Sequence, residues 1–102
     1  MKQKMSINQI CILSALQSDD RYGLELIKII KEEANISILL GSLYNILSKL
    51  DREGLIESYW GEATSERGGA RRKYYKITGH GETSLNEVRD GLTNWWGKIA
   101  LA

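Results

Sequence analysis

A segment in the second half of the chain concentrates positive charge. Two adjacent glycines lie among five cations within ten residues, and one acid, Glu66, precedes them. Arginine and lysine pair with phosphate oxygens, and glycines let the backbone follow a groove closely. The clustering favours contact with nucleic acid, and the alternative is a charged hairpin kept soluble by its tip. The residues concerned are Arg67, Gly68, Gly69, Arg71, Arg72, Lys73 and Lys76.

A second candidate group lies on the outer face of a helix predicted at about residues 41–53. At about 100° per residue, its apolar positions from Leu43 to Leu50 fall in one arc and must pack against other helices. Asparagine can form two hydrogen bonds with adenine, and Ser, Tyr and Lys suit phosphates or base edges in a major groove. Alone, a polar face is ordinary for an amphipathic helix, but the basic segment behind it indicates a DNA-reading helix. The polar arc and its flanks hold Tyr44, Asn45, Ser48, Lys49 and Arg52.

The elements that must position these two groups follow the order of a winged helix-turn-helix. A first helix begins at Ser6, where Gln9 completes a capping box, and it ends near Gln17. The fold class is therefore mainly α with a small antiparallel β-hairpin (α+β). Residues 1–78 are expected to form the winged helix-turn-helix and residues 79–102 the C-terminal dimerisation helix, in a single unit. The other elements are predicted at 22–33 (helix), 36–39 (brief strand), 55–60 and 72–77 (hairpin strands) and from Thr78 onward (helix).

Two further interpretations concern buried positions. Neighbours on a strand point to opposite faces, so one of Tyr74 and Tyr75 enters the core and the other faces outward. The pattern leaves open which of the two faces the DNA. The single cysteine, Cys11, is interpreted as a buried structural thiol. It belongs to the face of the first helix that is expected to turn inward, which holds Ile7, Ile10, Cys11, Leu13 and Leu16.

Composition limits the classes of function. The 102 residues suffice for one small domain, and 42% hydrophobic and 26% charged residues are ordinary for a globular protein. A net charge of +1 points to no partner, so the case for nucleic acid depends on local clustering. We find no nucleophile–base pair, metal cluster or phosphate cradle, so neither an enzyme nor a cofactor is expected. Without a signal peptide or an apolar run of about 18 residues, a cytoplasmic protein without a membrane partner is expected.

Several short motifs together resemble the PadR family of transcriptional regulators, over about residues 8–95. The resemblance implies a winged-helix repressor that binds operator DNA as a homodimer and often responds to a small aromatic compound. It maps recognition-helix contacts onto Ser42, Tyr44, Asn45 and Lys49, and wing contacts onto residues 67–73. The motifs are Gly41-Ser42-Leu43-Tyr44, Glu53-Gly54-Leu55-Ile56, Trp60-Gly61-Glu62, the segment 66–75, Ile77-Thr78 with Gly81, and Arg21-Tyr22-Gly23 with Glu25.

The chain departs from the family pattern at three places, one of which is the wing, where the proline found in some members is absent. Leu39 and Leu40 stand where many relatives have a polar residue or proline, so the third helix lacks an obvious side-chain cap. The segment Gly79-His80-Gly81 makes the start of the last helix looser than usual. The three departures affect the expected boundaries of the elements more than the expected function.

The C-terminal helix carries an apolar stripe with Trp96 about 100° to one side of it. Packing on the first helix is one use of this stripe, but a shared dimer core is favoured because a small domain has little core of its own. A flat aromatic ligand can stack on the tryptophans, although a plain hydrophobic interface explains them better. The stripe has 3-4 spacing and consists of Leu85, Val88, Leu92, Trp95 and Ile99.

Two hypotheses follow from these patterns. The first is a sequence-specific DNA-binding transcriptional regulator, a homodimeric repressor on a pseudo-palindromic operator in double-stranded DNA, relieved by a small aromatic effector. The alternative is a winged-helix interaction module that binds an acidic protein partner and contacts DNA only weakly and without sequence preference.

Overall fold

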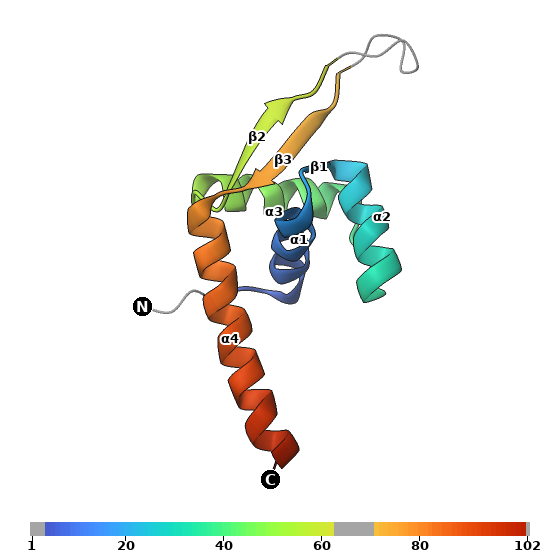
Figure 1. Cartoon of the computed structure of the whole chain (residues 1–102). Coiled ribbons are helices and arrows are strands. Elements are labelled where there is room, and N and C mark those ends of the chain that lie inside the picture. The colour runs from blue at the N-terminus through green and yellow to red at the C-terminus, as the bar shows by residue number, and fades with distance from the viewer. Residues whose placement is uncertain (1–3, 63–70, 102) are drawn as a thin grey trace.

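The computed structural model describes residues 4–62 and 71–101 of the 102-residue chain. Within these residues there are four helices and a small sheet whose hairpin projects from one end of the helices (Figure 1). The last helix, α4 (Gly79–Leu101), leaves the domain as a long arm. The molecule is elongated, with principal extents of 57 × 27 × 22 Å. In chain order the elements are α1 (Ile7–Ser18), β1 (Arg21–Tyr22), α2 (Gly23–Ala34), α3 (Leu40–Arg52), β2 (Ile56–Trp60), β3 (Lys73–Ile77) and α4 (Gly79–Leu101).

The three strands form an antiparallel sheet in the order β1-β3-β2, so the second strand of the hairpin lies in the middle. β1 pairs with β3 and places Tyr22 opposite Tyr74. The strand predicted at residues 36–39 is wrong, because the third strand instead precedes α2. The β-branched Ile38 in that segment is buried in the core without any strand pairing. Its residue type therefore reflects burial and not sheet formation.

α1 begins where the sequence predicts, because the capping box is formed. The Ser6 hydroxyl accepts a hydrogen bond from the Gln9 backbone N–H at 3.2 Å, and the Gln9 side-chain oxygen accepts one from the Ser6 N–H at 2.8 Å. The predicted inward face is partly wrong: Ile12 and Leu13 are fully buried, whereas Ile7 is exposed. α1 carries apolar residues on several sides, so its periodicity alone does not select the buried face.

Leucines and isoleucines from all four helices and from β2 form the core. α3 starts one residue before the predicted position and has Leu39 as its N-cap, which supplies no side-chain hydrogen bond. After α3, Gly54 adopts a φ of 75°, the left-handed conformation that glycine tolerates and that ends many helices. The largest fully buried side chains are Ile12, Leu13, Leu16, Leu26, Leu43, Leu47, Leu50, Leu55, Ile56 and Leu85.

Thr78 joins the sheet to α4, as the sequence predicts. Its hydroxyl accepts a hydrogen bond from the Gly81 N–H at 3.0 Å and donates one to the Gly54 carbonyl at 2.7 Å. Gly81 lies directly against the Leu55 carbonyl oxygen, and a Cβ at this position would also stand 2.8 Å from Ile77 Cγ1. The close approach of α4 to the sheet therefore requires glycine.

The first half of α4 packs on α1, and the second half does not. Arg89 donates a hydrogen bond to the Gln17 side-chain oxygen at 2.7 Å, and Gln17 donates one to Asn86 at 3.4 Å. Beyond these residues, α4 extends away from the other elements (Figure 1). The chain thus presents a globular end with the hairpin and an arm at the opposite end.

Candidate nucleic-acid interface

The outer face of α3 is exposed as the sequence predicts. Leu43, Leu47 and Leu50 are buried and fix the rotation of the helix about its axis, while Ile46 is half-buried at the edge. Because these anchors are in the core, the opposite face must point to solvent. All of the predicted contact residues of α3 are on the exposed side: Ser42, Tyr44, Asn45, Ser48 and Lys49.

Tyr44 also connects α3 to the start of α2. A Cβ placed on Gly23 would lie 2.7 Å from the Tyr44 hydroxyl oxygen and 3.1 Å from its Cζ, so the tyrosine occupies the space that glycine leaves. The sequence alone did not reveal this packing role, although the glycine after Tyr22 was a visible signal.

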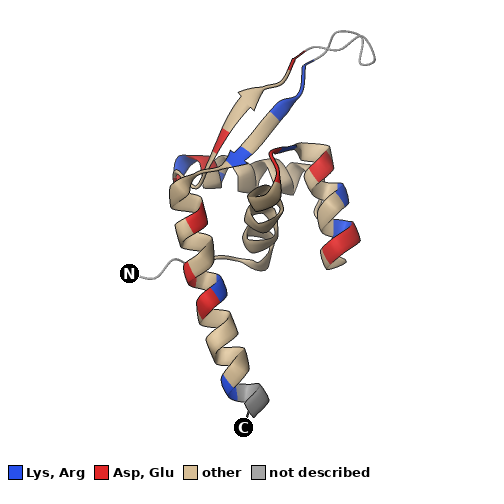
Figure 2. Cartoon of the chain, viewed as in Figure 1, with Lys and Arg blue, Asp and Glu red and all other residues tan. Residues whose placement is uncertain are grey.

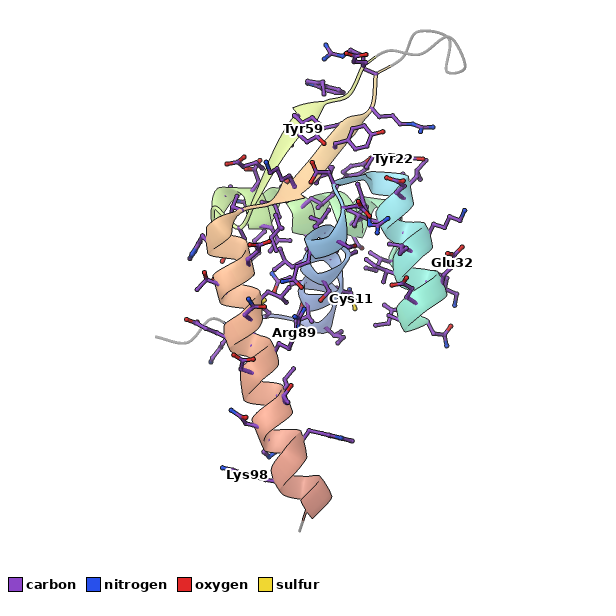
Figure 3. The ribbon with its side chains drawn as sticks, viewed as in Figure 1. Cys11, Tyr22, Glu32, Tyr59, Arg89 and Lys98 are labelled. Carbon is purple, nitrogen blue, oxygen red and sulfur yellow. The ribbon has the colours of Figure 1, made fainter. Side chains whose placement is uncertain are left out.

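The structure decides which tyrosine of β3 faces the core. Tyr75 is buried, whereas Tyr74 is half-buried on the other face of the sheet. The Tyr74 ring stacks on Tyr59 with centroids 5.7 Å apart and meets the edge of Tyr22 at 5.6 Å. Figure 3 shows Tyr59 and Tyr22 on the strands that flank β3. The three rings stiffen the hairpin where β1 also pairs with β3, and sequence reasoning had identified only Tyr74 among them.

The two arginines just before β3 are held by contacts with neighbouring strands. Arg71 donates a hydrogen bond to the Gly61 carbonyl at 2.9 Å and another to the Trp60 carbonyl at 3.4 Å. The Arg72 guanidinium lies 4.2 Å from the centroid of the Tyr22 ring, a cation–π contact. These two arginines are therefore oriented before any partner binds. The predicted wing residues Arg67, Gly68 and Gly69 lie outside the described residues.

Lys73 and Trp60 form a second cation–π pair, with the ammonium nitrogen 5.9 Å from the ring centroid. Trp60 is largely exposed and was not among the predicted site residues. Lys73 and Lys76 are both exposed on β3 (Figure 2, blue). The hairpin thus combines exposed cations with exposed aromatic surface, a combination that suits a sugar–phosphate backbone.

A hydrogen bond ties the hairpin to the turn between α1 and β1. The Tyr59 hydroxyl donates to the Asp20 carboxylate at 2.7 Å. This bond is the main cause that raises the pKa of Tyr59, and the negative charge of Asp20 contributes in the same direction. Tyr59 and Asp20 are 39 positions apart, so no local pattern in the sequence predicted their pairing.

The apolar stripe of α4 is divided between two environments. Leu85 is fully buried in the chain's own core, so its assignment to a dimer surface is corrected, and Val88 is half-buried. Farther along the helix, the side chains of Leu92, Trp95 and Trp96 are 51%, 61% and 68% exposed. The reason is geometric, since only the first turns of α4 reach α1. Ile99, the last residue of the stripe, lies outside the residues whose side chains are described.

A small cavity of about 230 Å³ lies between α1 and α2. Cys11 lines it and packs against the core, but it is half-buried, so the thiol predicted to be buried is only partly enclosed. Desolvation nevertheless raises the pKa of the Cys11 thiol. Figure 3 shows Cys11 on the side of α1 turned toward α2. The described residues contain no cluster of three or more potential metal ligands and no helix apolar and long enough to cross a membrane.

Comparisons with known proteins agree with this geometry. A protein of Lysinibacillus sphaericus without assigned function is 34% identical over 90 residues, which are 86% of this chain and 76% of the relative. The crystal structure of a PadR family transcription regulator from Clostridium difficile R20291 superimposes with a TM-score of 0.76 at 30% identity, over 92% of this chain and 94% of the other.

A third comparison includes bound DNA. Bacillus subtilis PadR, in complex with operator DNA, superimposes with a TM-score of 0.71 at 24% identity, over 80% of this chain and 47% of the other. At this identity the likeness concerns the fold, a winged helix with an added C-terminal helix. Residues 12–87 match the transcriptional regulator PadR-like family, whose members are regulators and not enzymes. From the family match and the fold together, the chain belongs to the PadR-like family of transcriptional regulators.

Proposed function

We propose that this regulator is a homodimeric repressor that binds a pseudo-palindromic operator in double-stranded DNA. The observation that carries the proposal is the exposed polar face of α3, held in place by buried leucines and continued by a cationic hairpin. α3 enters the major groove and the β2–β3 hairpin contacts the adjacent backbone or minor groove. Residues 1–78 then form the DNA-binding unit and residues 79–102 the dimerisation helix.

Within the groove, the side chains of α3 have different tasks. Asn45 can pair with adenine through two hydrogen bonds and therefore carries sequence preference. Ser42, Ser48 and Lys49 suit phosphates or base edges, while Tyr44 approaches DNA from a position already fixed against α2.

The hairpin supplies affinity that does not depend on sequence. Arg71, Arg72 and Lys73 are the described cations nearest to its tip, and the first two are already oriented by the Trp60 carbonyl and the Tyr22 ring. Each phosphate that such a cation neutralises releases counterions from the DNA. Binding is therefore expected to weaken steeply as the salt concentration rises.

A second copy of the chain is proposed to cover the exposed part of α4. Leu92, Trp95 and Trp96 present apolar surface on an arm that nothing in the described chain covers. Tryptophan is a frequent anchor of protein interfaces. Two copies joined in this way would bind two half-sites about one or two helical turns apart, as paired recognition helices do.

A small aromatic effector is the proposed signal. The side chains of Leu92, Thr93, Trp95 and Trp96 line a shallow hollow in which a flat ring can stack. A ligand bound between two copies would change their separation and so release the operator. Quenching of tryptophan fluorescence by aromatic compounds, followed by loss of operator binding, is the test of this part.

The operator complex of Bacillus subtilis PadR supports the proposal, because that protein has the same fold and binds operator DNA. The test is selection of bound sequences from a random pool of duplexes at physiological salt. The proposal predicts enrichment of an inverted repeat. Weak binding without enrichment would instead favour an interaction module for an acidic protein partner.

A further inference from the structure

Two adjacent leucines at the start of α3 are exposed, and neither belongs to the hydrophobic core. Leu39 is 78% exposed and Leu40 is 44% exposed. Leu39 is the N-cap of the helix, where leucine is among the poorest residues because it accepts no hydrogen bond from the first turn. Leu39 therefore has neither the burial that favours leucine nor the capping hydrogen bond that serine or aspartate would supply.

The leucines are continuous with the proposed DNA-reading face. Leu40 and Tyr44 are four positions apart in α3, so their side chains are neighbours on the helix surface. Tyr44 is itself exposed, and its hydroxyl end lies over Gly23. The cations of α3, Lys49 and Arg52, lie in its last turns. The helix thus has an apolar first turn, and its cations lie in the last turns, beside Asp51 and the C-cap Glu53.

Duplex DNA offers one apolar group at the floor of the major groove, the C5-methyl of thymine. The N-terminal residues of a recognition helix are the ones that approach base edges most closely. Resting on the proposed operator binding, we infer that Leu39 and Leu40 contact thymine methyl groups and make thymine a required base in each half-site. These side chains are specificity-determining residues that add apolar recognition to the polar contacts of Asn45.

Protein partners fit this surface less well. The apolar surface available to a second copy lies on the α4 arm, at Leu92, Trp95 and Trp96, and α4 extends away from α3 (Figure 1). The leucine pair, in contrast, borders a face that is otherwise polar and basic. Such a border matches a DNA groove, in which methyl groups lie between hydrogen-bonding edges and phosphates.

The test removes single methyl groups from the DNA. Each thymine of a duplex selected from a random pool is replaced in turn by deoxyuridine, which lacks only the C5-methyl. Affinity is measured for the wild-type chain and for Leu39→Ala/Leu40→Ala. The wild-type chain should lose about four-fold in affinity for each contacted methyl group. The double variant should bind the thymine and uridine duplexes equally.

Two further variants separate recognition from folding. Leu39→Ser supplies the missing N-cap hydrogen bond, so it should raise the unfolding temperature. Because it also removes the apolar side chain, it should reduce the difference in affinity between thymine and uridine duplexes. Leu24→Ala removes a leucine of α2 that is 61% exposed, a value between those of Leu40 and Leu39. This variant should lose as much affinity as the wild-type chain when uridine replaces thymine.

The inference is overturned if no uridine substitution weakens DNA binding by the wild-type chain. It is also overturned if the double variant still binds thymine and uridine duplexes with different affinities. It is also overturned if Leu39→Ala/Leu40→Ala changes the oligomeric state in sedimentation, since the leucines would then belong to a contact between copies. Failure to recover any preferred duplex would reject the proposed function itself, and this result is distinct from the other two.

Discussion

Single aromatic residues join the proposed DNA-contacting surfaces to the body of the domain. Tyr44 fills the space over Gly23, and Tyr74 lies between Tyr22 and Tyr59. Such contacts hold a recognition helix and a hairpin in one relative orientation before DNA binds. Preorganisation of this kind lowers the entropy lost on binding.

Asn45→Ala should change which sequence is bound more than how tightly DNA is bound in general. Loss of a two-bond contact with a base costs about 1–3 kcal/mol of discrimination. Affinity for the selected operator should fall accordingly, while affinity for unrelated duplexes should stay constant. Asn94→Ala, an exposed asparagine on α4, is the matched control and should affect neither. Equal losses on all duplexes would argue against base reading by Asn45.

Tyr59 should ionise at higher pH than an ordinary tyrosine, because its neutral phenol donates to Asp20. A folded-state pKa raised above the unfolded value of about 10 gives a stabilising contribution below pH 10 that disappears as pH rises through the raised pKa. Absorbance titration of tyrosinate is the measurement. Tyr59→Phe should remove the part of the absorbance change that occurs at the highest pH, and Asp20→Asn should move that part to lower pH. A titration curve of unchanged shape in both variants would contradict the hydrogen bond.

At the scale of elements, helices with a cap and a clear period could be predicted, and contacts distant in sequence could not. Ser6 with Gln9, Thr78 and Gly54 mark boundaries that depend on neighbouring residues only. β1 is two residues long and exists because β3 pairs with it, so no local pattern revealed it. The predicted face of α1 was partly wrong because apolar residues surround that helix.

The candidate site divides in the same way. The exposed face of α3 followed from the spacing of its buried leucines. The roles of Trp60 and Tyr59 did not, because they arise from cross-strand and long-range neighbours. Leu85 was assigned to the wrong surface, since a stripe on a helix does not tell which of its turns the domain already covers.

Two glycines of α4 offer a matched test of the packing between this helix and the sheet. Gly81→Ala places a Cβ against the Leu55 carbonyl, a backbone atom that cannot move cheaply, and should destabilise the fold by about 1–3 kcal/mol. Gly91→Ala meets no atom within 4 Å and should stabilise the helix by up to about 1 kcal/mol. Chemical denaturation measures both. Similar effects of the two substitutions would mean that α4 does not approach Leu55 closely.

At the scale of the whole molecule, the hairpin and α3 are at one end and the apolar part of α4 forms an arm (Figure 1). An elongated chain with separate surfaces can bind a partner copy and DNA at once. Operator recognition by a dimer gains from the two half-sites being linked, because the second contact becomes intramolecular.

Leu92→Ser/Trp96→Ser should convert the proposed dimer to a monomer in sedimentation velocity. Both side chains are more than half exposed in the single chain, so the folded domain should persist in circular dichroism. Affinity for the selected operator should fall at least ten-fold through loss of linkage, an estimate on the order of the lower end of multivalent gains. Leu24→Ser, an exposed leucine on α2, should leave the assembly unchanged. A wild-type chain that sediments as a monomer at micromolar concentration would contradict the proposed dimer.

The most direct test of DNA binding by α3 and the hairpin is a titration of the selected operator at several salt concentrations. The wild-type chain should show affinity that falls steeply with salt, and Arg71→Ala/Arg72→Ala should bind every duplex more weakly. Its plot of log affinity against log salt should be flatter by about 3.6, because a bound dimer loses four phosphate contacts and each removes about 0.9 from the slope. Lys28→Ala/Lys31→Ala, which removes two cations from α2, is the control and should keep the wild-type slope. Equal affinity and equal slope for the arginine variant and the wild-type chain would contradict the central claim.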